Sequence, residues 1–237
     1  KNVTSYPRDH KKISSEELSY IENNAPASEA ITQIPLSKLL SNLPFIAIIV
    51  ATFANNWSLL VFLSFLPKFV DNELGVDLSS GSFLVLIIIP SIVSVIALNL
   101  GGYIADTLIK KGYKVIKVRK SANSIGFFGS AACLFTIPFL NDVYTIIGLI
   151  CMTNIFTGAA AGGFGVNHAD LGPKSTGTLV GIASTLGTAA GVLGNIISGI
   201  VLDLTQSWTL VFFIAAGLLV FGGIFYLLFA SDKKQFD

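Results

Sequence analysis

Residues 99 to 120 read Asn-Leu-Gly-Gly-Tyr-Ile-Ala-Asp-Thr-Leu-Ile-Lys-Lys-Gly-Tyr-Lys-Val-Ile-Lys-Val-Arg-Lys, and this stretch decides the fold class. An apolar segment long enough to cross a bilayer leads into it and ends at Gly101 to Asp106. Six of the chain's 15 basic residues follow, and a second apolar segment then begins. Short cytoplasmic loops of membrane proteins are enriched in Lys and Arg. The stretch therefore predicts two membrane spans joined by a short cytoplasmic loop.

Composition extends this pattern to the whole chain. Of 237 residues, 52% are hydrophobic and 12% are charged, whereas a soluble domain carries about 25% charged residues. A large soluble helical core would need a polar face on most helices, and the apolar segments have almost none. We therefore predict an all-α polytopic membrane protein. Its six spans should lie near residues 43–70, 82–105, 123–140, 143–166, 175–202 and 208–230.

The basic residues are segregated to one side of the predicted membrane. With six spans both chain ends share a side, and 14 of the 15 Lys and Arg residues fall there, Lys68 being the exception. The positive-inside rule assigns that side to the cytoplasm. The basic residues thus orient the chain in the lipid bilayer, and nucleic acid is not an expected partner. Residues 1–41 become a cytoplasmic segment, 42–231 the transmembrane bundle and 232–237 a cytoplasmic tail.

Polar residues inside two spans are candidates for a solute path. The first span is interrupted by two adjacent asparagines, whose amides need partners in a water-filled cavity or on a neighbouring helix. In the fifth span, small residues recur every four positions from Ala183 to Asn195 and favour close helix packing. Hydroxyl side chains lie beside this ridge. The candidate substrate-binding residues are Asn55, Asn56, Ser184, Thr185 and Thr188.

Catalytic or metal chemistry is not indicated. Cys133 and Cys151 lie inside spans and fit small packing positions, and neither a metal-ligand cluster nor a phosphate-cradling loop is present in the sequence. We therefore expect no metal, no cofactor and no enzyme activity. A glycine run after the fourth span leads to His168 and Asp170, which could relay protons or could simply cap the turn. No Asp, Glu, Lys or Arg lies mid-span, where ion paths usually carry one.

The loop after the second span resembles the signature of the major facilitator superfamily, G-x-x-x-D-[RK]-x-G-[RK]-[RK]. Gly102, Asp106, Lys110 and Lys111 match it, and two other positions depart from it. This resemblance implies that Asp106 latches the cytoplasmic side in one state. From the residues themselves, Arg119 or the loop lysines could donate charge-assisted hydrogen bonds to its carboxylate.

Further stretches resemble the anion:cation symporter family, which includes sialin, the vesicular glutamate transporters and the plant-type organellar phosphate transporters. Residues 53–57 look like its seventh helix. Residues 163–170, which contain Asn167, His168 and Asp170, look like its G-F-x-x-N-H-x-D at the end of the tenth helix. Residues 229–235 resemble its closing F-A-S-G-E-x-Q.

This resemblance implies that the six spans are helices seven to twelve, the C-terminal bundle of the major facilitator fold, and that residues 1–41 end the central loop. The N-terminal six-helix half is then an expected partner, and the chain, which starts at Lys1, is expected to be part of a longer polypeptide. The implied function is alternating-access transport of a small anion with H⁺ or Na⁺.

Asn55 bears on the substrate, because the glutamate-type members carry an Arg at the corresponding position. The glutamate-type branch is therefore disfavoured. Residues 123–129 and 201–208 look closer to the phosphate branch, so inorganic phosphate is favoured. Organic anions such as sialic acid or dicarboxylates remain the alternative, and a non-transporting receptor or scaffold on the same fold is a second. The particular membrane is left open.

Overall fold

The computed structural model describes residues 7–10, 12–24, 34–75 and 81–236, and its chain forms two units, Lys1–Gln33 and Ile34–Asp237. The first unit contains a 3-10 turn, η1 (Pro7–Asp9), and a short helix, α1 (Ser15–Asn24). The Ser14 hydroxyl caps α1 by accepting a hydrogen bond from the Glu17 N–H at 3.1 Å. This unit is described by itself.

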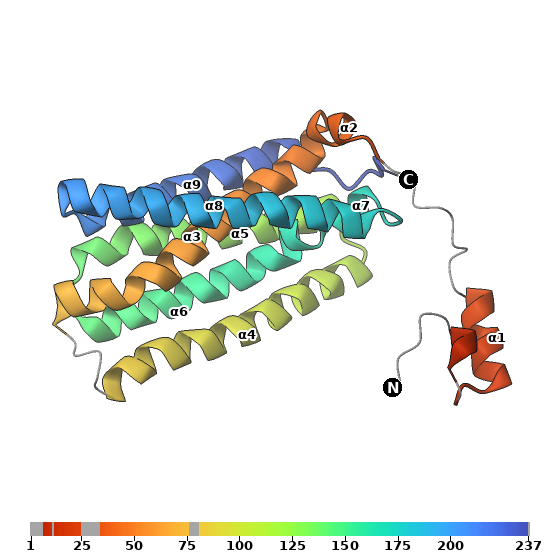
Figure 1. Cartoon of the computed structure of the whole chain (residues 1–237), viewed down its shortest axis with the longest axis horizontal. Coiled ribbons are helices and arrows are strands. Elements are labelled where there is room, and N and C mark those ends of the chain that lie inside the picture. The colour runs from red at the N-terminus through yellow and green to blue at the C-terminus, as the bar shows by residue number, and fades with distance from the viewer. Residues whose placement is uncertain (1–6, 11, 25–33, 76–80, 237) are drawn as a thin grey trace. The chain divides into compact units, whose positions relative to one another are not determined.

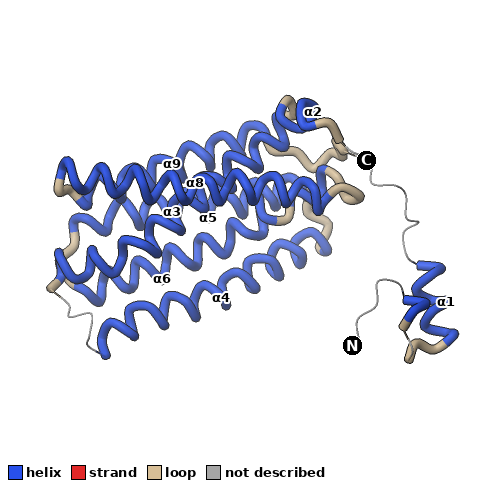
Figure 2. The backbone as a smooth tube through the Cα atoms, in the orientation of Figure 1, coloured by secondary structure: helices blue, strands red, loops and turns tan. Residues whose placement is uncertain are grey.

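The second unit is a bundle of long helices that run along a common direction (Figure 1). The described residues contain helices and loops and no strand (Figure 2). Six helical segments are long and apolar enough to cross a membrane, which confirms the all-α membrane fold. The elements are α2 (Leu36–Leu40), α3 (Leu43–Leu74), α4 (Gly81–Lys110), α5 (Val115–Thr136), η2 (Ile137–Phe139), α6 (Val143–Ala160), η3 (Ala161–Gly165), α7 (Asn167–Leu171), α8 (Thr176–Thr205) and α9 (Trp208–Phe229).

Local signals set the ends of these helices. The Asn42 side chain accepts a hydrogen bond from the Phe45 N–H at 3.0 Å and so caps the start of α3. Gly75 ends the same helix in the left-handed conformation, with φ of 61°, which glycine adopts without steric cost. The short helix α2 belongs to the same unit as the bundle, and the first membrane-length helix begins at Leu43.

The third span starts earlier than the sequence analysis predicted. We expected it near residue 123, but α5 begins at Val115, so Lys117, Arg119 and Lys120 are helical and do not belong to the loop. The connection needs only a tight turn, in which Gly112 has φ of 90°. The carboxylate of Asp232 supports the early start by accepting a hydrogen bond from the Ile116 N–H at 3.2 Å.

Small residues determine how the helices approach one another. α3 packs on α8 and α9, α5 packs on α6 and α9, and α4 packs mainly on α6. A side chain at Gly101 of α4 would collide with the backbone carbonyl of Gly158 in α6. A side chain at Gly191 of α8 would collide with Leu60 of α3. These contacts confirm that the ridge in the fifth span is a packing surface.

The last residues of the chain fold back onto the bundle. We call residues 231–236 the C-terminal strap. The N–H groups of Gln235 and Phe236 donate hydrogen bonds to the Leu171 carbonyl at 2.7 and 3.1 Å. Phe236 is 2% exposed and packs edge-on against Phe45, with ring centroids 6.0 Å apart. The strap therefore ties the end of α9 to α3, α5 and α7, and it shares one end of the bundle with α2 and α7 (Figure 1).

Candidate functional site

A small polar pocket lies in the middle of the bundle, between α3 and α6. Its volume is about 40 Å³. Apolar side chains from α3, α5, α6 and α9 make up the rest of its lining, and the pocket is partly open, since Leu59 in that lining is 42% exposed. The polar side chains that line it are Asn55, Ser58, Thr153, Asn154 and Thr157.

The polar side chains around this pocket still have hydrogen-bond donors and acceptors that a solute could use. Thr153 and Thr157 donate their hydroxyl protons to backbone carbonyls one turn earlier, at 2.9 and 2.8 Å. Ser58 donates to the Ala215 carbonyl of α9 at 3.3 Å. Among the described residues, Asn55 makes only a long side-chain contact, 3.5 Å from its Nδ2 to the Oδ1 of Asn56. Because this bond is at the limit of useful geometry, the Asn55 amide can turn toward a solute.

Asn154 joins the pocket to a wider groove. Its Nδ2 donates to the Pro90 carbonyl of α4 at 3.1 Å. It also lines a groove of about 260 Å³ between α3, α4 and α6, together with Ser91 and Ser94. The two spaces share Leu59 and Phe62. Polar side chains thus continue from Asn55 toward the open side of α4.

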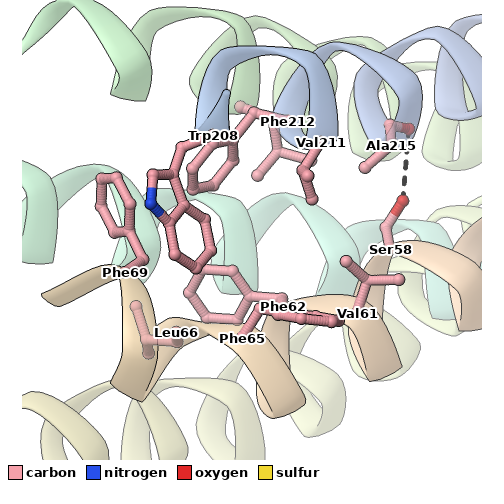
Figure 3. A pocket seen from close by; sticks show the side chains of 11 residues that line it. Ser58, Val61, Phe62, Phe65, Leu66, Phe69, Trp208, Val211, Phe212 and Ala215 are labelled. Carbon is pink, nitrogen blue, oxygen red and sulfur yellow. Dashed lines mark hydrogen bonds between the residues drawn. The ribbon is translucent and has the colours of Figure 1, made fainter. Parts of the chain in front are cut away.

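On the other side of Ser58 the bundle is closed by aromatic packing (Figure 3). The space there measures about 20 Å³ and is lined by apolar side chains apart from Ser58. Trp208 packs edge-on against Phe69, with ring centroids 5.4 Å apart, and Phe69 packs against Phe212 at 5.1 Å. This region is core and closes one end of the polar path.

The candidate residues of the fifth span do not join this pocket. Ser184, Thr185 and Thr188 lie exposed on α8, and both threonine hydroxyls bond to carbonyls of α8 itself. Asn56 packs against Gly187 of α8. A Cβ atom added at Gly187 would lie 2.7 Å from the Nδ2 of Asn56. Of the five predicted residues, only Asn55 lines the pocket. The two adjacent asparagines therefore point to different sides of α3.

A buried ion pair organises the end of the bundle that carries α7. Arg119 Nε lies 2.9 Å from Asp170 Oδ2, and the two side chains are 8% and 18% exposed. Arg119 also donates to the Gly162 carbonyl in η3 at 3.0 Å. Asn167 donates to Asp170 at 3.1 Å and accepts from the Tyr226 hydroxyl of α9 at 3.0 Å. The network joins α5, α7 and α9.

In this structure the Arg119 guanidinium binds Asp170 and the Gly162 carbonyl and not Asp106, so the loop lysines are the predicted partners of Asp106 that stay available. Asp106 is exposed near the end of α4. Within this bundle a side chain at Gly102 would meet open space, so the close contact of α4 with α6 does not lie at this residue. The contact falls one residue earlier, at Gly101. Lys110 ends α4 and Lys111 lies in the turn.

The structure shows that the His168 side chain is buried. It is 5% exposed within α7, at the end of the bundle that carries the ion pair. Among the described residues no group of three or more His, Cys, Asp or Glu side chains could hold a metal ion.

Comparison with known proteins identifies the family. The model of the family described as Major Facilitator Superfamily matches residues 3–187. The chain belongs to the Major Facilitator Superfamily. A chloroplastic ascorbate transporter of Arabidopsis thaliana is 34% identical over 98% of this chain and 42% of its own length. A chloroplastic sodium-dependent phosphate transport protein of the same plant is 32% identical over 98% and 45%. Human sialin is 32% identical over 98% and 48%.

These relatives fit the anion:cation symporter family, as the sequence motifs suggested. The chain spans about half the length of the relatives it matches, from 39% to 55% of each. The sequence analysis missed three polar residues that line the pocket: Thr153, Asn154 and Thr157. Their spacing of one and three residues on an otherwise apolar span was a readable signal, because it places polar groups on one side of a helix.

Proposed function

We propose that this chain is the C-terminal half of an ion-coupled transporter that moves a small anion, inorganic phosphate being favoured, by alternating access. The observation that carries the proposal is the partly open pocket around Asn55, whose polar side chains are uncharged, in a superfamily member whose relatives are named as transporters. Transporters of this architecture bind their substrate between two bundles near the membrane midplane.

An uncharged pocket suits one side of an anion site. Amide and hydroxyl donors hold an anion by hydrogen bonds that are strong in a shielded environment. A full positive charge there would be costly without a partner, and the described residues that line the pocket include no charged side chain. The charge of the substrate is then balanced by a cotransported cation and by the N-terminal half. Na⁺ and H⁺ are the candidate cations.

The buried network and Asp106 have separate parts in this proposal. Arg119, Asp170 and Asn167 hold α5, α7 and α9 together, so this bundle moves as one body. Asp106 is exposed on α4, where it can meet the other half when the cytoplasmic side is closed. Both ends of the described bundle are then cytoplasmic, as the positive-inside rule suggests.

Uptake into proteoliposomes tests the proposal. The purified full-length protein should take up labelled phosphate when a Na⁺ or H⁺ gradient is imposed, and phosphate should be recovered unchanged. Asn55→Leu removes the adaptable amide and should raise KM severalfold. Asn99→Ala is the matched control, since Asn99 is exposed on α4 and bonds to its own helix. Equal uptake by the wild type and Asn55→Leu would contradict the assignment of the pocket.

Organic anions are the second candidate, because two relatives are named for ascorbate transport and as sialin. Competition by ascorbate, sialic acid and dicarboxylates in the same assay distinguishes the substrates. An organic anion that is accumulated while phosphate is not would replace phosphate in the proposal. Binding of an anion without any flux would favour a receptor or scaffold on the same fold.

A further inference from the structure

We propose that the groove between α4 and α5 binds an anionic phospholipid from the leaflet on the side of the α4–α5 loop. The acyl chain lies in the groove and the phosphate meets Lys117. This site is separate from the polar pocket and does not depend on the transported substrate.

The groove is large and mostly apolar. It measures about 420 Å³, compared with about 260 Å³ for the groove beside Asn154. α4 and α5 form its walls, and Ala159 of α6 lies at its floor. Ile104 and Ile125, one on each wall, are 55% and 58% exposed. The remaining apolar lining is Gly101, Ala105, Leu108, Val118 and Ala122.

Packing elsewhere in the bundle keeps this groove open. α4 approaches α6 closely through Gly101 and Gly158, and it makes few contacts with α5. Figure 1 shows α4 along one edge of the bundle beside α6. The gap on the α5 side is therefore a consequence of where the small residues lie. In a membrane-spanning helix pair, an apolar gap of this kind is filled by lipid chains or by protein.

Polar groups are confined to the loop end of the groove. Lys117, Tyr113 and Ser121 line it there, and Lys117 and Tyr113 are exposed. Three more lysines, Lys110, Lys111 and Lys114, lie in or beside the connecting turn. The groove is thus basic and hydrogen-bonding at one end and apolar along its length.

In the part of the chain that the structure describes, no ion pair neutralises the lysines at this end of the groove. Asp170 is paired with Arg119, and Asp232 accepts a hydrogen bond from the Ile116 N–H. Asp106 is exposed on α4 and does not line the groove. Clusters of lysine just outside a membrane-spanning helix attract anionic lipids, and basic pockets between such helices bind their head groups.

The layout favours a lipid over the other possible occupants. Free phosphate would gain nothing from the apolar walls, and an apolar helix of another bundle would gain nothing from Lys117. A phospholipid matches both parts, because its charged group and its chains are separated in the same order as the lysines and the apolar walls.

Native mass spectrometry of the full-length protein in detergent tests the affinity. Phosphatidylglycerol should bind more tightly than phosphatidylcholine with the same chains. Lys117→Gln should weaken phosphatidylglycerol binding about fivefold, the effect of one lysine near an anionic head group. Lys117→Arg should retain it, and Lys38→Gln, which removes an exposed lysine of α2, is the matched control. Equal binding by Lys117→Gln and the wild type would overturn the proposal.

A second measurement locates the lipid. A bimane label on Ser121→Cys should be quenched by brominated acyl chains in nanodiscs, and Ala122→Phe, which fills the groove, should reduce phosphatidylglycerol binding without changing charge. Absence of quenching would mean that protein covers the groove and would overturn the proposal. Competition by soluble glycerol phosphate at lipid-like concentrations would instead indicate a head-group site without a chain. Substrate uptake is a separate readout, so loss of the lipid site leaves the proposed transport function untouched.

Discussion

Single side chains at the loop end of the bundle do more than the sequence pattern indicates. In the sequence Arg119 is one of six basic residues of the predicted loop, yet it is buried and binds Asp170 and the Gly162 carbonyl. A buried ion pair with further hydrogen bonds is costly to break from one side, because the remaining charge is left without a partner.

Removing either partner of this pair should therefore destabilise the bundle. Arg119→Ala should lower the free energy of unfolding by about 3 kcal/mol, and Asp170→Ala by a similar amount. The double variant should lose much less stability than the sum of the two single losses, because neither charge is then left buried without a partner. Thermal and denaturant unfolding in detergent measures the cycle. Additive losses would show that the two side chains act independently.

Asp142 is a second residue whose contribution to stability can be predicted. It lies in the connection between α5 and α6, at the end of the bundle opposite the α4–α5 turn. Its carboxylate accepts hydrogen bonds from the Thr145 hydroxyl at 2.6 Å and the Thr145 N–H at 2.8 Å. These bonds, the hydroxyl first, hold the pKa of Asp142 below its usual range. The group then contributes stability at pH values above its unfolded pKa of about 3.9.

That contribution should disappear as the pH falls through the folded pKa of Asp142. Thermal melting between pH 6 and pH 3 should show a loss of stability in the wild type at the acid end. Asp142→Asn can still cap the helix but carries no charge. Its melting temperature should therefore fall less steeply than that of the wild type as the pH is lowered toward 3. An identical fall in the two proteins would contradict a role for the ionised cap.

At the scale of elements, helix contacts depend on which face of a helix a glycine occupies. Gly101 and Gly102 are adjacent in α4, but only Gly101 touches the backbone of α6. Gly158 of α6 meets the Ala97 backbone in return. This contact sets the spacing of α4 and α6, and with it the width of the groove on the α5 side.

The two neighbouring glycines form a matched pair of variants. Gly101→Ala should destabilise the bundle by about 1–3 kcal/mol, because the new methyl group must push two backbones apart. Gly102→Ala should be neutral or stabilising by up to about 1 kcal/mol, because alanine favours the helix and the space is open. Unfolding in detergent compares them. Equal effects would mean that α4 and α6 are not in close contact.

The C-terminal strap is the second element whose contribution to stability can be measured on its own. Phe236→Ala should lower the free energy of unfolding by about 3 kcal/mol, since a buried ring is lost. Lys233→Ala in the same strap should have little effect, because Lys233 is exposed. Proteolysis near residue 230 should also become faster in Phe236→Ala alone. Unchanged stability of Phe236→Ala would show that the strap is not packed.

At the scale of the whole molecule, the membrane orientation remains a prediction. Single cysteines in place of Lys38, Lys114 and Lys233 should react with an impermeant thiol reagent from one side, in a background without the two native cysteines. A cysteine in place of Lys68 should react from the other side. The measurement uses sealed vesicles of known orientation. Labelling of positions 114 and 233 from opposite sides would refute the six-span topology.

The sequence by itself determined the class of the molecule. Six apolar stretches and segregated lysines are one-dimensional signals, because a bilayer imposes length and hydropathy on each span separately. The loop and tenth-helix motifs were likewise sufficient to name the family. Asn55 was found for the same reason, since an amide inside an apolar span stands out without knowledge of its neighbours.

Only the tertiary structure decided which polar residues meet. Asn55 faces Thr153 and Asn154 of α6 and not the threonines of α8, because helix rotation and packing set that face. Arg119 pairs with Asp170, which lies 51 residues away in the sequence, and not with Asp106. The groove between α4 and α5 has the same origin: a gap depends on how closely other helices pack, and no single segment encodes that distance.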